Sequence, residues 1–176
     1  SFNQNLNTWN VSNVTNMARM FAEATSFNGN IADWDVSKVT NMSKMFQWAV
    51  GFNQNIGGWN TSNVTSMVEM LYGAKIFNQD IGNWDVSNVT NMLAMLSVAN
   101  KFNQDLGSWD VSSVTNMENM FADATDFSQN LSNWCVTSIT SKPFGFDDLS
   151  SLVASQLPVW GTCPAASTAC GELFFS

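Results

Sequence analysis

The sequence predicts an α/β solenoid of about six coils, because the chain repeats itself with a strict period of 25 residues. Alignment at this period places a Phe column, from Phe2 to Phe127, and a Trp column, from Trp9 to Trp134, in register without an insertion or deletion. A period of roughly 20 to 30 residues is typical of proteins whose coils stack because one coil cannot bury its own apolar face. The apolar spacing within each coil alternates between a helical and a strand-like pattern, which indicates the α/β class.

The two patterns occupy different parts of each coil. Between residues 17 and 24 the apolar residues lie at positions i, i+3, i+4 and i+7, which form one face of a short helix. Between residues 9 and 11 they alternate with a polar residue and are flanked by Asn, Asp and Gly, which predicts a short strand between turns. Stacking would then place the strands in parallel, about 4.7 to 5 Å apart, in a leucine-rich-repeat-like arrangement. A pure β-helix without the helical piece is the alternative.

Polar residues also form columns, and two interpretations are open for them. Stacked amides and hydroxyls can satisfy backbone groups at the bends and can hydrogen-bond to each other from coil to coil. Alternatively, a regular Thr or Ser column on an outward, flat face could bind ice or polysaccharide. We expect the structural role for the columns that begin at Asn3, Ser12, Thr15 and Asn16.

The repeat pattern fades after Trp134, so we divide the chain into solenoid repeats at residues 1–141 and a C-terminal cap at residues 142–176. The segment 146–160 carries Leu and Val at helical spacing, with Asp near its start and Pro158 near its end, which predicts a helix laid over the last coil. A solenoid needs such a cap because its final coil otherwise exposes apolar side chains and strand edges.

All three cysteines, Cys135, Cys163 and Cys170, lie in or beside the cap. In an extracellular protein we expect a disulfide across the cap, with Cys135 to Cys163 as the first pairing and Cys163 to Cys170 as the second. Three buried free thiols are the alternative. The chain has no His, and its cysteine spacing lacks a second ligand pair, so we expect no zinc site.

Composition argues against several classes of function. The net charge is −8 and the six basic residues are scattered, whereas nucleic acids and anionic membranes require clustered basic side chains. No apolar run approaches the roughly 18 residues that a membrane span needs. Because the chain has no His, Ser-His and Cys-His catalysis are excluded, and we expect no enzyme activity and no cofactor.

Two aspartate columns leave one metal question open. Neighbouring coils would bring Asp85 close to Asp110, and Asp80 close to Asp105. Such an acidic edge is either solvated or a place where Ca²⁺ can bind between carboxylate oxygens. We expect the solvated edge and therefore no metal site.

Sequons of the type N-x-S/T recur because the repeat itself contains the string NVSNVT. The column that holds Asn13, Asn63 and Asn88 also accepts Lys38 and Ser113, which indicates exposure to solvent. These three asparagines are therefore the candidates for glycosylation, and on a secreted eukaryotic protein some of them would carry glycans.

The repeated string W-D/N-V-S-x-V-T-N-M-x-x-M-F/L-x-x-A-x-x-F-N-Q-x-I/L covers residues 1 to about 140. It resembles the 25-residue repeat of BspA-like surface proteins, which also occurs in mycoplasma lipoproteins. The resemblance implies a leucine-rich-repeat-like extracellular or cell-surface protein used in attachment or surface architecture. It supplies no catalytic residues.

We therefore expect a non-catalytic repeat module, extracellular or at the cell surface, that serves adhesion or builds a surface coat or filament. Its expected partners are other protein chains, surface glycans or further copies of itself, without nucleic acid and without direct insertion into a membrane. The alternative is a ligand-binding solenoid that recognises polysaccharide or ice through its Ser, Thr and Asn ladders.

Overall fold

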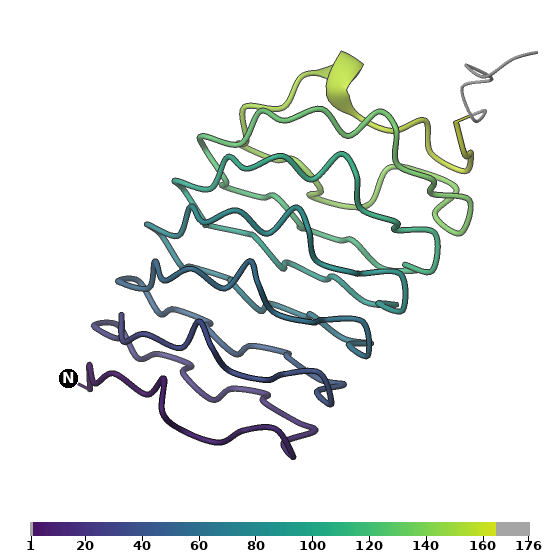
Figure 1. Ribbon diagram of the computed structural model, residues 1–176. Coiled ribbons are helices and arrows are strands. Elements are labelled where there is room, and N and C mark those ends of the chain that lie inside the picture. Colours follow the sequence, from purple (N-terminus) through teal and green to yellow (C-terminus); the bar gives the residue numbers. More distant parts are fainter. Residues whose placement is uncertain (1, 165–176) are drawn as a thin grey trace, which may run out of the picture.

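A computed structural model describes residues 2–164 of the chain. The chain winds into a stack of coils, each displaced along the stack from the one before it (Figure 1). We number coils 1 to 5 by their repeats, and coil 6 begins at residue 127. The five complete coils are residues 2–26, 27–51, 52–76, 77–101 and 102–126.

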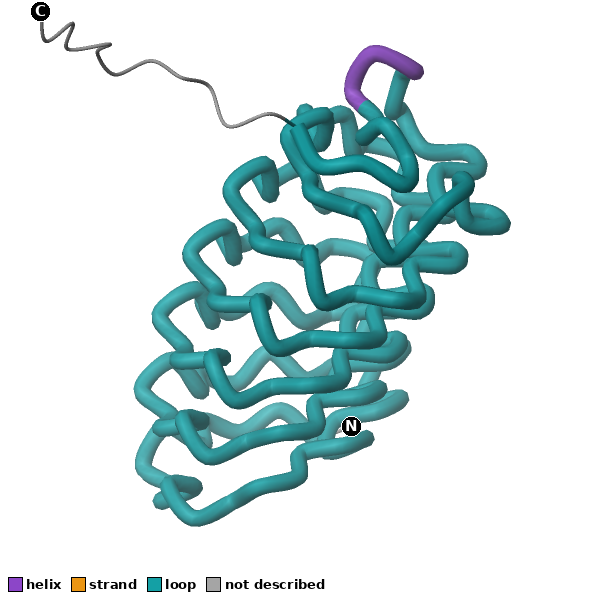
Figure 2. Tube along the Cα trace, turned by 90° about the vertical axis from the view of Figure 1, so that its right-hand side faces the viewer, coloured by secondary structure: helices purple, strands orange, loops and turns teal. Residues whose placement is uncertain are grey.

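The coils contain almost no regular secondary structure, so the predicted α/β solenoid is wrong, and so is the β-helix alternative. Figure 2 shows that the stacked chain consists of loops and turns. The one helix within residues 2–164 is the short 3₁₀ helix η1, Ala154–Gln156. The expected parallel strands are reduced to isolated parallel bridges, which join Asn16 to Asn41, Asn41 to Ser66, Ser66 to Asn91, and Asn91 to Asn116. The strand expected at residues 9–11 is absent.

Consecutive β-turns take the place of the helix expected at residues 17–24. In coil 1 the N–H of Met20 donates to the carbonyl of Met17 at 3.2 Å, and Arg19 between them has a φ of 63°, the mark of a type II turn. The N–H of Arg19 donates to the carbonyl of Ser43 in the next coil at 3.0 Å. Turns that follow one another every four residues bring the same positions to the interior as a helix would. They also leave alternate N–H groups free to donate hydrogen bonds to carbonyls of the neighbouring coil.

The apolar columns form a continuous core along the stack. The Phe column is fully buried from Phe27 to Phe127, and the centroids of adjacent rings lie 5.8 to 6.0 Å apart. The Trp column is buried as well from Trp34 onward, and each indole N–H donates to a backbone carbonyl of the preceding coil, as Trp84 does to Ile56 at 3.0 Å. Each coil therefore depends on its neighbours for both apolar contact and hydrogen bonding.

Two polar columns satisfy backbone groups at the bends, which confirms their predicted structural role. The Oδ1 of Asn3 accepts the N–H of Asn28 at 2.8 Å, and the same contact recurs between the following coils. The Oδ1 of Asn16 accepts the N–H of Ala18 at 2.9 Å, which is an Asx turn. Amide side chains recur at these positions because the backbone of each coil needs an acceptor there.

The C-terminal segment continues as an irregular coil instead of forming the helix expected at residues 146–160. Phe146 is fully buried, and its carbonyl accepts the N–H of Phe121 at 2.8 Å, as between complete coils. Leu149 has a φ of 59°, which no right-handed helix accommodates, and its side chain is 75% exposed. The predicted helix is therefore wrong, because Phe146 keeps the chain in register with the core columns and η1 is the one helical turn that remains in that segment.

Candidate functional site

The consecutive turns of coils 1 to 5 form one face of the stack, which we call the turn face: residues 18–23, 43–48, 68–73, 93–98 and 118–123. Two positions in each turn segment have a left-handed backbone, and most are occupied by residues other than Gly. This conformation costs such a residue about 1 to 2 kcal/mol. Hydrogen bonds between coils offset the cost, as where the N–H of Trp48 donates to the carbonyl of Tyr72 at 2.7 Å.

The outward positions of the turn face differ from coil to coil, whereas the inward positions repeat as Met, Met, Phe or Leu, and Ala. The repeat thus fixes the scaffold and leaves this face able to carry different chemistry in each coil. In coil order, the varying columns are Arg19, Lys44, Glu69, Ala94, Asn119; Ala22, Gln47, Tyr72, Ser97, Ala122; and Glu23, Trp48, Gly73, Val98, Asp123.

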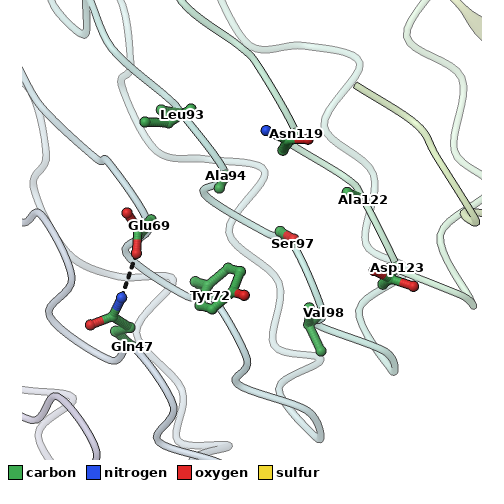
Figure 3. A pocket seen from close by; sticks show the side chains of 10 residues that line it. All are labelled: Gln47, Glu69, Tyr72, Leu93, Ala94, Ser97, Val98, Asn119, Ala122 and Asp123. Carbon is green, nitrogen blue, oxygen red and sulfur yellow. Dashed lines mark hydrogen bonds between the residues drawn. The ribbon is translucent and has the colours of Figure 1, made fainter. Parts of the chain in front are cut away.

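The turn face contains a hollow of about 600 Å³, lined by the side chains that Figure 3 labels. It exists because coil 4 carries Ala94 and Ser97 at the positions where coil 3 carries Glu69 and Tyr72. The two small side chains leave a depression between Glu69 and Tyr72 of coil 3 and the side chains of Asn119 and Asp123 in coil 5 (Figure 3). Its volume lies in the range of pockets that hold small ligands.

The polar groups of the hollow differ in how far the protein itself satisfies them. The carboxylate of Glu69 lies 3.1 Å from the Nζ of Lys44 and accepts a hydrogen bond from Gln47. Ser97 is only 4% exposed, and its hydroxyl has no hydrogen-bond partner within residues 2–164; because no fully buried polar side-chain atom there is unpaired, this hydroxyl meets solvent at the hollow. Among residues 2–164 the carboxylate of Asp123 also has no side-chain partner, so the hollow offers both a hydroxyl and a carboxylate to a ligand.

Sequence reasoning missed this hollow because it followed the columns that repeat. Ala94 and Ser97 belong to no motif, and neither residue type by itself indicates a site. The one signal in the sequence was indirect: residues in the outward columns of the turn face vary from coil to coil, whereas the other columns of the repeat recur.

The Thr column also lies on the outside of the stack, but away from the turn face. Its members from Thr15 to Thr140 are exposed. From Thr40 to Thr115, each hydroxyl donates to the carbonyl of the preceding Thr at 3.1 to 3.3 Å. The hydroxyls are therefore held in a row by the backbone, with lone pairs left toward solvent.

The glycosylation candidates Asn13, Asn63 and Asn88 are exposed, as the sequence pattern indicated. The amide nitrogen of Asn63 donates to the carbonyl of Ser37 at 2.7 Å, and that of Asn88 makes the same bond to the preceding coil at 2.8 Å. In Asn13 it is the amide oxygen that is engaged, by Lys38 at 2.7 Å. Glycosylation itself stays a prediction, and Asn13 presents its amide nitrogen with the least local competition.

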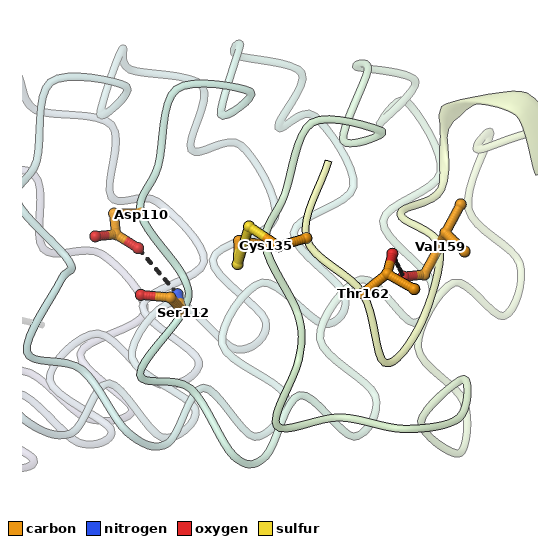
Figure 4. The surroundings of a disulfide bond; sticks show 6 residues. Asp110, Ser112, Cys135, Val159 and Thr162 are labelled. Carbon is orange, nitrogen blue, oxygen red and sulfur yellow. Dashed lines mark hydrogen bonds between the residues drawn. A yellow bond between two sulfur atoms is a disulfide. The ribbon is translucent and has the colours of Figure 1, made fainter. Parts of the chain in front are cut away.

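A disulfide joins Cys135 of coil 6 to Cys163, which is the first of the two pairings considered from the sequence (Figure 4). Beside it the N–H of Val136 donates to the carbonyl of Thr162 at 2.8 Å. Cys170 lies outside the described residues. The segment that contains Thr162 and Cys163 is therefore held to coil 6 by both a disulfide and a backbone hydrogen bond.

The aspartates that were considered as calcium ligands instead accept hydrogen bonds within turns. The hydroxyl and the backbone N–H of Ser87 donate to Asp85 at 2.6 and 3.0 Å, and they lower the pKa of this carboxyl below its ordinary value. Asp80, Asp105 and Asp110 accept the backbone N–H two residues later in the same way. Within residues 2–164 no three His, Cys, Asp or Glu side chains come together to hold a metal ion.

Comparison with known proteins gives one family. Two overlapping segments of the chain, residues 1–75 and 51–160, match the model described as "Mycoplasma protein of unknown function, DUF285". Neither curated proteins nor solved structures give a match. The family fits the resemblance to mycoplasma repeat proteins, whereas the finer assignment to BspA-like proteins stays a prediction. The described residues include no helix with the length and hydrophobicity that crossing a bilayer requires.

Proposed function

This chain belongs to the Mycoplasma protein family of unknown function DUF285, and from that premise we propose that it is a non-catalytic repeat module of the cell surface that serves adhesion. The turn face would contact the partner, which is another protein chain or a surface glycan. A surface coat or filament built from copies of the chain is a variant of the same proposal.

One observation carries this proposal: residues that vary between coils gather on the turn face, while residues that repeat fill the core and the hydrogen-bonded columns. Repeat proteins commonly bind partners over an extended surface made of side chains from several repeats. A scaffold with no recognition task has no need for Glu69, Tyr72 and Asp123 at positions where small residues also fit.

The disulfide supports an extracellular location, because disulfides form and persist in oxidising compartments. The low density of charged residues, 11% of the chain, leaves amide and hydroxyl groups as the main polar surface. Such groups suit hydrogen bonding to a partner without strong long-range attraction.

The test uses intact cells of the source organism. A protease that does not enter cells should release peptides of this chain, and added soluble chain should reduce attachment of the cells to the surface they colonise. Chain reduced and alkylated at its cysteines after unfolding serves as the control, because it has the same composition without the turn face. Full protection of the chain from protease on intact cells would contradict the proposal.

A second candidate function follows from the outward Thr column. A row of fixed hydroxyls, one in each coil, has the regularity needed to bind ice or a crystalline polysaccharide. Ice binding predicts thermal hysteresis in a solution of the purified chain, and a Thr65→Lys variant should reduce it. A freezing point equal to the melting point would dismiss the ice-binding candidate.

A further inference from the structure

We infer that the hollow of the turn face binds a neutral saccharide, namely a hexose unit of an oligosaccharide or polysaccharide. The inference rests on the proposed function of adhesion and names its ligand class. Saccharide binding can be measured on the isolated chain, so it can succeed or fail independently of adhesion.

The shape of the hollow comes from residue size along two columns. Coil 4 places the small Ala94 and Ser97 beside the larger Glu69 and Tyr72 of coil 3, with Asn119 and Asp123 of coil 5 on the other side (Figure 3). The resulting space of about 600 Å³ is open to solvent. An open depression can receive one unit of a longer chain whose ends extend beyond it. This geometry fits an oligosaccharide better than a fully enclosed small molecule.

The polar groups match the hydroxyls of a sugar. Ser97 is 4% exposed, and its hydroxyl has no protein partner among the described residues and meets solvent at the hollow, so a ligand hydroxyl can take the place of water there. The carboxylate of Asp123 accepts from two neighbouring hydroxyls, and the amide of Asn119 both donates and accepts. Figure 3 shows these groups on coils 4 and 5 around the same space.

Tyr72 supplies the apolar wall that the C–H face of a sugar ring requires. Its ring meets that of Trp48 edge to face with centroids 5.1 Å apart, which limits its movement. Trp48 in turn lies over Gly73, where an added Cβ would come within 2.4 Å of the indole. The wall is thus held in place before the ligand arrives, which reduces the entropy lost on binding.

Charge favours a neutral ligand. Among the residues that line the hollow, the charged side chains are Glu69 and Asp123, both negative, so phosphate, sulfate and acidic sugars are disfavoured. Glu69 is already paired with Lys44 at 3.1 Å, which leaves Asp123 as the one carboxylate that a cation could neutralise there. A single carboxylate among hydroxyl, amide and aromatic groups is less suited to a basic peptide than to a sugar.

The experiment titrates the ¹⁵N-labelled full chain with cellohexaose, maltohexaose and mannohexaose in turn, and with hexalysine as the cationic probe. Binding of at least one hexaose should shift the amide resonances of residues 94–98 and 119–123. The Ser97→Tyr variant places the residue of coil 3 in coil 4 and fills the hollow, so the shifts should disappear. Ala22→Tyr introduces the same side chain into the same column of coil 1 and should leave them unchanged.

A second variant protects the test against misfolding of Ser97→Tyr. Asp123→Asn keeps the shape and removes the carboxylate, and it should weaken binding of the hexaose about tenfold, which is the usual contribution of a hydrogen bond to a charged group. The inference is overturned if no hexaose shifts the amide resonances of the residues that line the hollow, if the shifted resonances belong to the Thr column, or if hexalysine alone binds. Soluble chain that blocks cell attachment without binding any hexaose would overturn this inference and leave the proposed function standing.

Discussion

The interior columns and the outward positions of the turn face belong to the same turns but follow opposite rules. In coils 3 and 4 the interior repeats itself, with Met70 and Met95 at the same position and both fully buried. On the turn face of the same coils Tyr72 is followed by Ser97, and Glu69 by Ala94. The interior must match the next coil at every step, whereas the outward positions meet solvent or a partner.

This difference separates stability from recognition within one short segment. A substitution in an interior column removes contacts with two neighbouring coils, so its cost is shared across the stack. A substitution at an outward position of the turn face changes the chemistry of the surface and leaves the hydrogen bonds between coils in place. Substitutions at the two kinds of position should therefore differ in their effect on stability.

Phe77→Ala should lower the free energy of unfolding by about 3 to 5 kcal/mol, because it opens a cavity in a fully buried aromatic column. Urea denaturation followed by Trp fluorescence measures the change. Ile76→Ala, one residue earlier and 46% exposed, is the control and should have a much smaller effect. Equal losses for the two variants would mean that the Phe column does not hold the stack together.

Gly73 and Val98 occupy the same left-handed position in successive coils, with φ values of 70° and 58°. Gly73→Val should destabilise the chain by about 2 to 4 kcal/mol, because a β-branched residue is strained there and its Cβ would collide with Trp48. The reverse change, Val98→Gly, relieves strain and should leave stability within about 1 kcal/mol of the parent. Thermal unfolding measures both, and a larger loss for Val98→Gly would refute this explanation.

Thr65→Val removes the hydroxyl that donates to the carbonyl of Thr40 at 3.1 Å. The expected loss is about 0.5 kcal/mol, because the bond is exposed and water can replace it. Thr65→Ser keeps the hydroxyl and serves as the matched control in the same urea experiment. A loss well above that of Phe77→Ala would show that the outward hydroxyls, and not the core, carry the stack.

Asp85 should produce the smallest effect, and one that depends on pH. Its folded-state pKa is lowered by the hydroxyl and N–H of Ser87, so its contribution is present above the unfolded pKa of about 3.9 and is lost as the pH falls through the folded value. Asp85→Asn keeps the turn-capping oxygen, as Asn60 does one coil earlier, and removes this contribution. The difference should be about 0.3 kcal/mol or less after screening by solvent.

Thermal unfolding of the parent and Asp85→Asn at pH 2.5 and at pH 6 measures this, with the two proteins converging at the lower pH. A parent that gains stability relative to the variant on acidification would contradict the sign.

The core could largely be predicted from the sequence, but its secondary structure could not. From coil 2 onward the Phe, Trp and Met columns are buried because a 25-residue period brings identical side chains together. The helix at residues 17–24 was a wrong interpretation, since turns repeated every four residues give nearly the apolar spacing of a helix. Arg19 and Trp48 adopt left-handed backbones without being turn-forming residue types, so nothing local in the sequence distinguished the two.

The candidate site was less accessible to prediction than the core. The exposure of Asn13 and the proximity of Cys135 and Cys163 follow from column composition and cysteine placement. The hollow arises from the contrast between Ser97 and the Tyr72 beside it, and that contrast acquires meaning once the two are known to be neighbours across coils. Ser97 contributes to a candidate site because larger side chains lie beside it in the folded chain.

The most direct measurement compares two double variants for both stability and inhibition of cell attachment. Tyr72→Ala with Asp123→Ala alters the turn face, and Thr65→Val with Thr90→Val alters the Thr column. We expect the first variant to keep its urea midpoint near that of the parent and to block attachment no longer, and the second to be slightly less stable and still to block attachment. A turn-face variant that blocks attachment as well as the parent would contradict the division between a repeating scaffold and a recognising face.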